Sequence, residues 1–301
     1  MNVIAIFGPT ASGKSAVAVE LAELAGGEII SADAMQLYRG LPLLTNQPSP
    51  ADVERAPHHL VGIWEPSHEG SVAEYAGLAH EAIDDVIRRG RVPIVSGGSG
   101  LYLRAALADL PLPPQAEPRV REAAERLYDE RGPASAHATL AAVDAPAAAA
   151  VHPNDRRRVV RALQLAETGH TLAASPESAL WSAETRHRTV IAGLTLTPAE
   201  TARRIAARTE AMFAAGVAEE VRNARAAHAF SLTAERIHGL QDVTALLAGE
   251  IDAAEARRRL ETRTRQYAKR QRTWMRRLPD VRFVDADRAP AAIAGDIAGW
   301  A

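Results

Sequence analysis

Eight residues near the start of the chain have the types and spacing of a phosphate-binding loop. Residues 8–15 read Gly-Pro-Thr-Ala-Ser-Gly-Lys-Ser, between an apolar, strand-like run, Val3 to Phe7, and a helix-like run, Ala16 to Leu24. In such a loop the backbone N–H groups and the helix N-terminus point at an anion, and the glycines allow its close approach. The lysine adds a positive charge and the last serine offers a hydroxyl to Mg²⁺. We expect a diphosphate or nucleotide to be bound by Gly8, Pro9, Thr10, Ala11, Ser12, Gly13, Lys14 and Ser15, with Ser15 as metal ligand.

A carboxylate follows the second strand-like run. Asp33 lies just beyond Glu28 to Ser31. The carboxyl ends of parallel strands share one edge of a sheet, and ligands bind at that edge. Asp33 could equally cap a helix over Ala34 to Tyr38, and a capping role does not exclude chemistry.

A second glycine-rich loop follows the strand-like run Val92 to Ser96. It reads Gly-Gly-Ser-Gly at residues 97–100 and carries the hydroxyl of Ser99. The strand ends in Ser96 rather than in the acidic residue of a usual Walker B motif. This weighs against an ordinary motor-type ATPase.

Arginines concentrate in three helical regions. A helix is expected to begin at Thr197-Pro198 and to run to about His228. In it Arg204 and Arg208 are four residues apart, so they can clamp an anion or pair with Glu200. Residues 113–187 also carry arginine runs, which are usually a solvated helix face. The segment from Glu255 to Arg277 has ten basic residues against two acidic ones, with Leu260, Tyr267 and Trp274 as an apolar stripe. This last segment is typical of a helix that faces a polyanion.

These patterns predict the fold class and its division. The chain has 301 residues, of which 47% are hydrophobic, a net charge of −2 and no cysteine, so neither a disulfide framework nor a strongly basic protein is indicated. We expect an α/β, P-loop NTPase-like parallel sheet flanked by helices, formed by residues 1–112 and 188–301, with an all-helical insertion domain at 113–187. The sequence has no apparent leader and no long apolar segment, which predicts a cytoplasmic protein without a membrane span.

The residues leave more than one function open. A small-molecule P-loop kinase fits the phosphate loop. An enzyme that uses the loop to hold a diphosphate, while its basic helices hold RNA, fits the loop and the arginines together. A regulatory nucleotide-binding module fits less well, because nothing resembles switch segments or a guanine-reading motif.

Seven motifs, taken together and in order, resemble those of the bacterial tRNA dimethylallyltransferases (isopentenyltransferases). The resemblance extends over almost the whole chain. The motifs are GPTASGKS at 8–15, ISADAMQLYRG at 30–40, PHHL at 57–60, SVAEY at 71–75, GGSGLY at 97–102, NDRRRVVRAL at 154–163 and QYAKRQRTW at 266–274.

The resemblance implies prenyl transfer. A dimethylallyl group would move from dimethylallyl diphosphate to N6 of the adenosine 3′ of the tRNA anticodon, position 37, with release of diphosphate. Asp33 matches the family's catalytic acid and would accept the N6 proton. Ser99, at a position that is usually threonine, would bond the bridging oxygen of the leaving group. Arg208, or less favourably Arg204, would add a cation, and Mg²⁺ on Ser15 would be the cofactor.

The resemblance also implies where tRNA binds. The chain is expected to act as a monomer and to contact tRNA through Asp33, Ala34, Met35, Gln36, Ser99, Arg121, Arg157, Arg158, Val159, Val160, Arg161, Arg236, Gln241, Lys269 and Arg270. Besides Ser99, the sequence departs from the family pattern at two places. LTNQP stands at 44–48 where GTAKP is usual, and HGLQ at 238–241 lacks the usual aromatic and cation.

Overall fold

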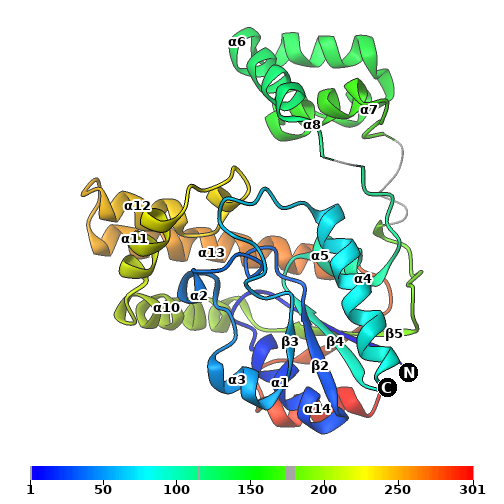
Figure 1. Ribbon diagram of the computed structural model, residues 1–301, viewed down its shortest axis with the longest axis vertical. Coiled ribbons are helices and arrows are strands. Elements are labelled where there is room, and N and C mark those ends of the chain that lie inside the picture. Colours follow the sequence, from blue (N-terminus) through cyan, green and yellow to red (C-terminus); the bar gives the residue numbers. More distant parts are fainter. Residues whose placement is uncertain (1, 114, 174–179, 301) are drawn as a thin grey trace. The chain divides into compact units, whose positions relative to one another are not determined.

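The structure is a computed structural model that describes residues 2–113, 115–173 and 180–300. The chain divides into two compact units (Figure 1). One consists of Met1–Asp109 with Ala183–Ala301, and the other of Leu110–Ser182. None of the described helices combines the length and the apolar composition that a membrane span requires.

The first unit is built on a six-stranded parallel sheet. The strand order is β3-β2-β4-β1-β5-β6, and every neighbouring pair is parallel. The strands are β1 (Val3–Phe7), β2 (Gly27–Ser31), β3 (His58–His59), β4 (Val92–Gly97), β5 (Thr189–Thr195) and β6 (Val281–Asp285). The predicted α/β class with a flanked parallel sheet is confirmed.

Helices cover both faces of this sheet (Figure 1). Helix α1 (Lys14–Ala25) and helix α14 (Pro290–Ala298) share a buried cluster with β1, in which Ile6, Leu21 and Ile297 are fully buried. Successive strand side chains alternate between faces, and the opposite face carries α4 (Val72–Arg88) and α5 (Gly100–Leu107). The sheet is therefore a rigid support for the loops at its carboxyl edge.

Four further helices stand beside that edge. They are α10 (Pro198–Ala214), α11 (Val217–Ala227), α12 (Leu240–Leu247) and α13 (Ala253–Met275). The single helix predicted from Thr197 to about His228 is wrong, because Gly216 has a φ of 93° and separates α10 from α11. Two short helices, α2 (Pro42–Thr45) and α3 (Pro50–Arg55), lie between β2 and β3. A 3₁₀ turn, η1 (Ala234–Arg236), precedes α12.

Among its described residues, the second unit contains helices and connecting segments but no strand. Its helices are α6 (Pro118–Val143), α7 (Ala145–Ala150) and α8 (Arg156–Glu167). Gly132, at φ 79° and ψ 167°, breaks the helical path of α6 just before Pro133. Tyr128, Leu140 and Val159 belong to its own small core.

Candidate functional site

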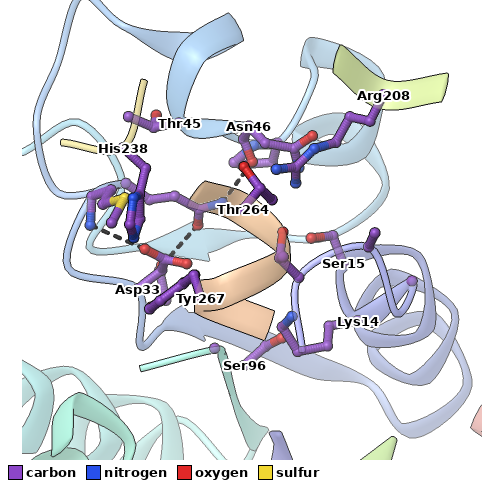
Figure 2. A pocket seen from close by; sticks show the side chains of 18 of the residues that line it. Lys14, Ser15, Asp33, Thr45, Asn46, Ser96, Arg208, His238, Thr264 and Tyr267 are labelled. Atoms are coloured by element: carbon purple, nitrogen blue, oxygen red, sulfur yellow. Dashed lines mark hydrogen bonds between the residues drawn. The ribbon is translucent and has the colours of Figure 1, made fainter. Parts of the chain in front are cut away.

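A pocket of about 410 Å³ opens at the carboxyl edge of the sheet. The phosphate-binding loop follows β1, Asp33 follows β2, and β4 lies between these two strands. Two strand spacings separate the loop from the carboxylate by roughly 10 Å. Figure 2 shows Asp33 on one side of the pocket and Lys14 and Ser15 on the other. From the predicted set the pocket is lined by Thr10, Ala11, Gly13, Lys14, Ser15, Asp33, Met35, Gln36 and Arg208.

Two residues of the loop between β1 and α1 have a left-handed backbone. Gly13, the residue before α1, has a φ of 84°, and Ala11 has a φ of 65°. A positive φ costs a residue with a side chain more than it costs glycine. The loop leads into the N-terminus of α1, a 12-residue helix without a side-chain cap, and the N–H groups and dipole of such a terminus favour an anion there.

Lys14 is the cation of the phosphate-binding loop. Its Nζ donates a hydrogen bond to the Pro9 carbonyl oxygen at 2.9 Å. Removal from water lowers the pKa of Lys14 to about 8; the negative charge of Asp33 opposes this shift and the positive charge of Arg208 adds to it. Below that pH the ammonium stays charged, and a bound anion would strengthen the charged form.

Asp33 is followed by a turn rather than by a helix. Its Oδ1 accepts a hydrogen bond from the Met35 backbone N–H at 3.0 Å, and residues 34–37 form turns. The predicted helix over Ala34 to Tyr38 is therefore wrong, because this local hydrogen bond competes with a helical path. The turn holds the carboxylate in the pocket beside Tyr267 and His238 (Figure 2).

The two arginines of α10 differ in their partners. Arg204 donates to Glu200 at 2.6 Å and to Asp287 at 2.8 Å, so the alternative of pairing with Glu200 holds for this residue. Within the described part of the chain, Arg208 forms no hydrogen bond or ion pair. Burial lowers its pKa, and the charge of Asp33 opposes this. Arg208 is thus the arginine of the pair that has its guanidinium available for an anion in the pocket.

His238 and Tyr267 form an aromatic wall of the pocket. The sequence did not predict that these two residues are in contact. Their ring centroids are 4.5 Å apart. Burial, assisted by Arg270 and Arg263, lowers the pKa of His238 to about 4, so the imidazole is neutral near pH 7. The unusual sequence at 238–241 was the available signal, but it did not reveal that His238 faces the pocket.

Ser99 is not among the residues that line the pocket. It precedes α5, and its side chain makes no capping hydrogen bond. The glycines around it are explained by packing. A Cβ on Gly98 would lie 2.2 Å from the Gln271 side chain, and one on Gly100 would lie 2.2 Å from the Trp274 ring. The glycine-rich loop thus permits α13 to approach the end of β4.

Other predicted residues lie away from the pocket lining. Among them are Gly8, Pro9, Ser12, Ala34, Arg236, Gln241, Lys269 and Arg270. Arg236, Gln241, Lys269 and Arg270 are exposed, and so are Arg157 and Arg158 in the second unit. Arg121 and Arg161 are partly exposed there, whereas Val159 and Val160 are 0% and 5% exposed and pack in the core of that unit. The side chains of these two valines therefore do not form part of an RNA-facing surface.

The basic residues of α13 fall into two groups. Toward its N-terminus, Arg258 and Arg259 pair with Glu255 at 2.7 and 2.6 Å, and Arg263 pairs with Asp242 at 3.2 Å. Farther along, Lys269, Arg270 and Arg272 form no ion pair with any other described residue. Surface ion pairs such as those in the first group contribute little stability, but they neutralise the charges of these arginines. The second group leaves its charges available to a polyanion.

The predicted apolar stripe of α13 is only partly correct. Leu260 is buried, but Tyr267 and Trp274 are half-buried, and Tyr267 lines the pocket. The packed face also includes Thr264, Ala268, Gln271 and Met275. Because several residues on this face are small or polar, the spacing of hydrophobic residues did not predict which face of α13 is buried.

The donors available to a metal ion are few. Among the described residues, no group of three or more His, Cys, Asp or Glu side chains is placed to hold an ion. The exposed Ser15 hydroxyl lines the pocket next to Lys14. Mg²⁺ commonly takes one or two protein oxygens and completes its shell with substrate phosphates and water. The residues present fit that kind of coordination.

The fold and the pocket define a class of protein. A parallel sheet with a phosphate cradle after β1, an acid after β2 and no acid at the end of β4 is a P-loop enzyme in which an anionic group and a carboxylate share one pocket. The comparisons specify the class further. The model of the IPP transferase family matches residues 36–278.

Relatives and solved structures agree with that match. The tRNA dimethylallyltransferase of Anaeromyxobacter dehalogenans (strain 2CP-C) is 43% identical over 98% of both chains, and that of Salinispora arenicola is 42% identical over 95% of this chain and 82% of the relative. The solved tRNA isopentenylpyrophosphate transferase of Bacillus halodurans has a TM-score of 0.73 at 32% identity, covering 99% of this chain and 95% of its own. A eukaryotic dimethylallyltransferase acting on tRNA has a TM-score of 0.76 at 27% identity, covering 95% and 74%.

The chain belongs to the tRNA dimethylallyltransferase family. The resemblance read from its motifs is confirmed, and the chain is a transferase of tRNA modification. The alternative of a small-molecule kinase is not favoured.

Proposed function

We propose that this chain transfers a dimethylallyl group from dimethylallyl diphosphate to N6 of adenosine 37, 3′ of the tRNA anticodon, and releases diphosphate. The observation that supports this most is the shared pocket, which brings Lys14 of the P-loop and Arg208 of α10 together with Asp33 at the carboxyl edge of the sheet. We also propose that the chain acts as a monomer.

The proposed reaction forms one N–C bond, breaks one C–O bond and transfers one proton. The N6 nitrogen attacks C1 of the dimethylallyl group, the C1–O bond breaks, and the electron pair leaves with the diphosphate. Asp33 accepts the proton that N6 loses. Lys14 and Arg208 stabilise the charge that develops on the leaving group, which is most effective in a site already arranged for it. The adenosine must leave its stack to reach the pocket, as in other base-modifying enzymes.

We also propose Mg²⁺ as cofactor, with Ser15 as its protein ligand. When bound, the ion would neutralise part of the diphosphate charge. For Ser99 we retain the proposed role of a hydroxyl partner to the leaving group, although it lies outside the pocket lining. That role requires the side chain to turn toward substrate when the site is filled.

tRNA contacts are proposed on both units. In the first unit the candidates are the exposed Lys269, Arg270, Arg236 and Gln241, with the turn after Asp33. In the second unit the candidates are the arginines at 121, 157, 158 and 161, and we propose this helical unit as a tRNA-binding domain.

The reaction is tested by incubating purified protein with tRNA, dimethylallyl diphosphate and Mg²⁺ in the absence of ATP. We expect nucleoside mass spectrometry to find N6-dimethylallyladenosine, mass spectrometry of ribonuclease fragments to place it at position 37, and pyrophosphate to be released in equal amount. A parallel reaction contains ATP and a small acceptor but no prenyl donor. ATP-dependent phosphorylation without a prenylated nucleoside would contradict the proposal.

The free charges of α13 give a second test. Replacing Lys269 and Arg272 by glutamine is expected to weaken tRNA binding and to reduce the slope of log K against log salt by about 0.7 to 0.9 for each residue that contacts a phosphate. Arg258→Gln is the matched control, because Arg258 is exposed on the same helix but is paired with Glu255. Filter binding across a salt series measures both. Equal slopes for the double variant and the wild type would show that this part of α13 is a solvated face.

A further inference from the structure

Gln271 joins the two glycine-rich loops of the site. It lies on α13, and only 4% of its surface is exposed. Its Oε1 accepts a hydrogen bond from the Thr10 backbone N–H at 2.7 Å, and its Nε2 donates to the Gly98 carbonyl oxygen at 2.8 Å. These two backbone groups follow neighbouring strands, β1 and β4, and are 88 residues apart in sequence.

The Thr10 N–H belongs to a peptide group that is held from both sides. Its carbonyl oxygen is that of Pro9, which accepts a hydrogen bond from Lys14 Nζ at 2.9 Å. Because a peptide unit is planar and trans, its N–H and C=O point in opposite directions. The same Pro9 oxygen also accepts a hydrogen bond from the Ser12 backbone N–H at 3.2 Å. Gln271 therefore fixes the N–H side of the Pro9–Thr10 peptide, Lys14 and Ser12 fix its carbonyl side, and a rotation of that peptide would break all three hydrogen bonds.

The two hydrogen bonds of Gln271 depend on a close approach to the loops and are made to partly or fully buried groups. A Cβ on Gly98 would lie 2.2 Å from Nε2, so the close approach depends on glycine at that position. Both bonded backbone groups are at least partly buried, and a buried N–H or C=O without a partner is costly. The side-chain amide of Gln271 offers an acceptor to the Thr10 N–H and a donor to the Gly98 carbonyl oxygen, so it satisfies both loops at once.

We propose that Gln271 is a positioning residue for the diphosphate site: it fixes the Pro9–Thr10 peptide and thereby sets where Lys14 is anchored and how the remaining loop amides point. It also connects this cradle to α13, whose exposed face carries the unpaired cations. The inference rests on the proposed function, because it assumes that the loop holds a diphosphate.

The test measures binding of inorganic pyrophosphate with Mg²⁺ by calorimetry, without tRNA or turnover. Gln271→Met keeps a similar volume but can neither donate to Gly98 nor accept from Thr10. We expect its pyrophosphate affinity to fall about tenfold to a hundredfold, in line with the loss of two buried hydrogen-bond partners. Affinity for tRNA should stay within about twofold of the wild type, because α13 keeps its packed face.

Gln271→Glu supplies a readout that a merely structural role would not change. An ionised glutamate can accept from Thr10, but its second oxygen repels the Gly98 carbonyl and the nearby diphosphate. A protonated glutamate can donate to Gly98, and burial favours that form. The affinity of this variant relative to the wild type should therefore rise as the pH falls from about 8 to about 6, whereas the same ratio for Gln271→Met stays flat.

Met275→Leu is the control, because Met275 is buried on the same helix face one turn farther on and lies outside the pocket lining. It should bind pyrophosphate as the wild type does. The inference is overturned if Gln271→Met keeps wild-type affinity, or if Gln271→Glu shows the same flat ratio as Gln271→Met. A wild-type protein that binds no pyrophosphate would instead contradict the proposed function, so the two failures are distinguishable.

Discussion

Replacing Asp33 by asparagine is expected to lower kcat by about two to four decades, the usual size of a general-base contribution. Asparagine keeps the shape of the side chain, and its Oδ1 can still accept the hydrogen bond from the Met35 N–H. The turn is therefore preserved while the proton acceptor is lost. Single-turnover kinetics with saturating tRNA and dimethylallyl diphosphate measure the change directly, and tRNA affinity should change little.

Asp285 offers a matched control for this variant. Its Oδ1 accepts a hydrogen bond from the backbone N–H two residues farther on, Asp287, at 3.0 Å, which is the same local pattern as at Asp33. Asp285 is exposed at the end of β6 and lies outside the pocket lining. Asp285→Asn should keep wild-type turnover. Wild-type turnover in Asp33→Asn as well would reduce Asp33 to a residue that stabilises its turn.

The assay pH matters for the Asp33 variant. The negative charge of Asp33 raises the pKa of Lys14, which stands at about 8 with this charge in place. Without the charge the pKa of Lys14 falls, and the lysine loses its proton at a lower pH. Comparison well below pH 8 keeps Lys14 charged in both proteins, so the loss then reports the missing base.

The sheet and its phosphate loop were predictable because their signals are local. Strand, loop and helix follow one another within residues 3–25, and the glycine, lysine and serine positions are fixed by backbone geometry. The position of Asp33 near the loop follows from parallel strands that share one edge. Its turn was not predictable in the same way, because helix caps and local turns use the same aspartate.

Long-range packing explains what the sequence did not reveal. His238 reaches the pocket because its segment lies next to Tyr267 on α13, and nothing in the spacing of residues 238 and 267 indicates such a contact. Gln271 occurs in a motif of charged and aromatic residues, and nothing in that motif indicates a special role for a neutral amide. Only the fold shows that its two bonds join the loops after β1 and β4.

The charge pattern of α13 shows a similar limit. The sequence indicates a basic helix, but it does not separate arginines that have carboxylate partners from those that have none. Glu255 lies within one turn of Arg258 and Arg259, a spacing that sequence reasoning can recognise. The pairing of Arg263 with Asp242 joins two helices and depends on their packing.

Lys14→Met is expected to lower the turnover rate by about two to three decades, comparable with the loss of one group that stabilises developing negative charge. The variant should also bind pyrophosphate more weakly below pH 8. In the wild-type protein the pKa of Lys14 is lowered to about 8, so the ammonium is charged below that pH and is lost as the pH rises through it. Calorimetric titration with pyrophosphate and Mg²⁺ at a series of pH values measures both effects.

The ratio of wild-type to variant affinity isolates the lysine, because the titration of pyrophosphate itself affects both proteins equally. This ratio should be large below pH 8 and should fall toward one as Lys14 loses its proton. Lys269→Met is the matched control: Lys269 is the other lysine of the chain and lies exposed on α13, so its loss should leave pyrophosphate binding unchanged at every pH. A ratio that stays constant between about pH 7 and pH 10 would mean that Lys14 keeps the ordinary lysine pKa. A ratio near one throughout would remove Lys14 from the diphosphate site, because its charge would then contribute nothing to holding the anion.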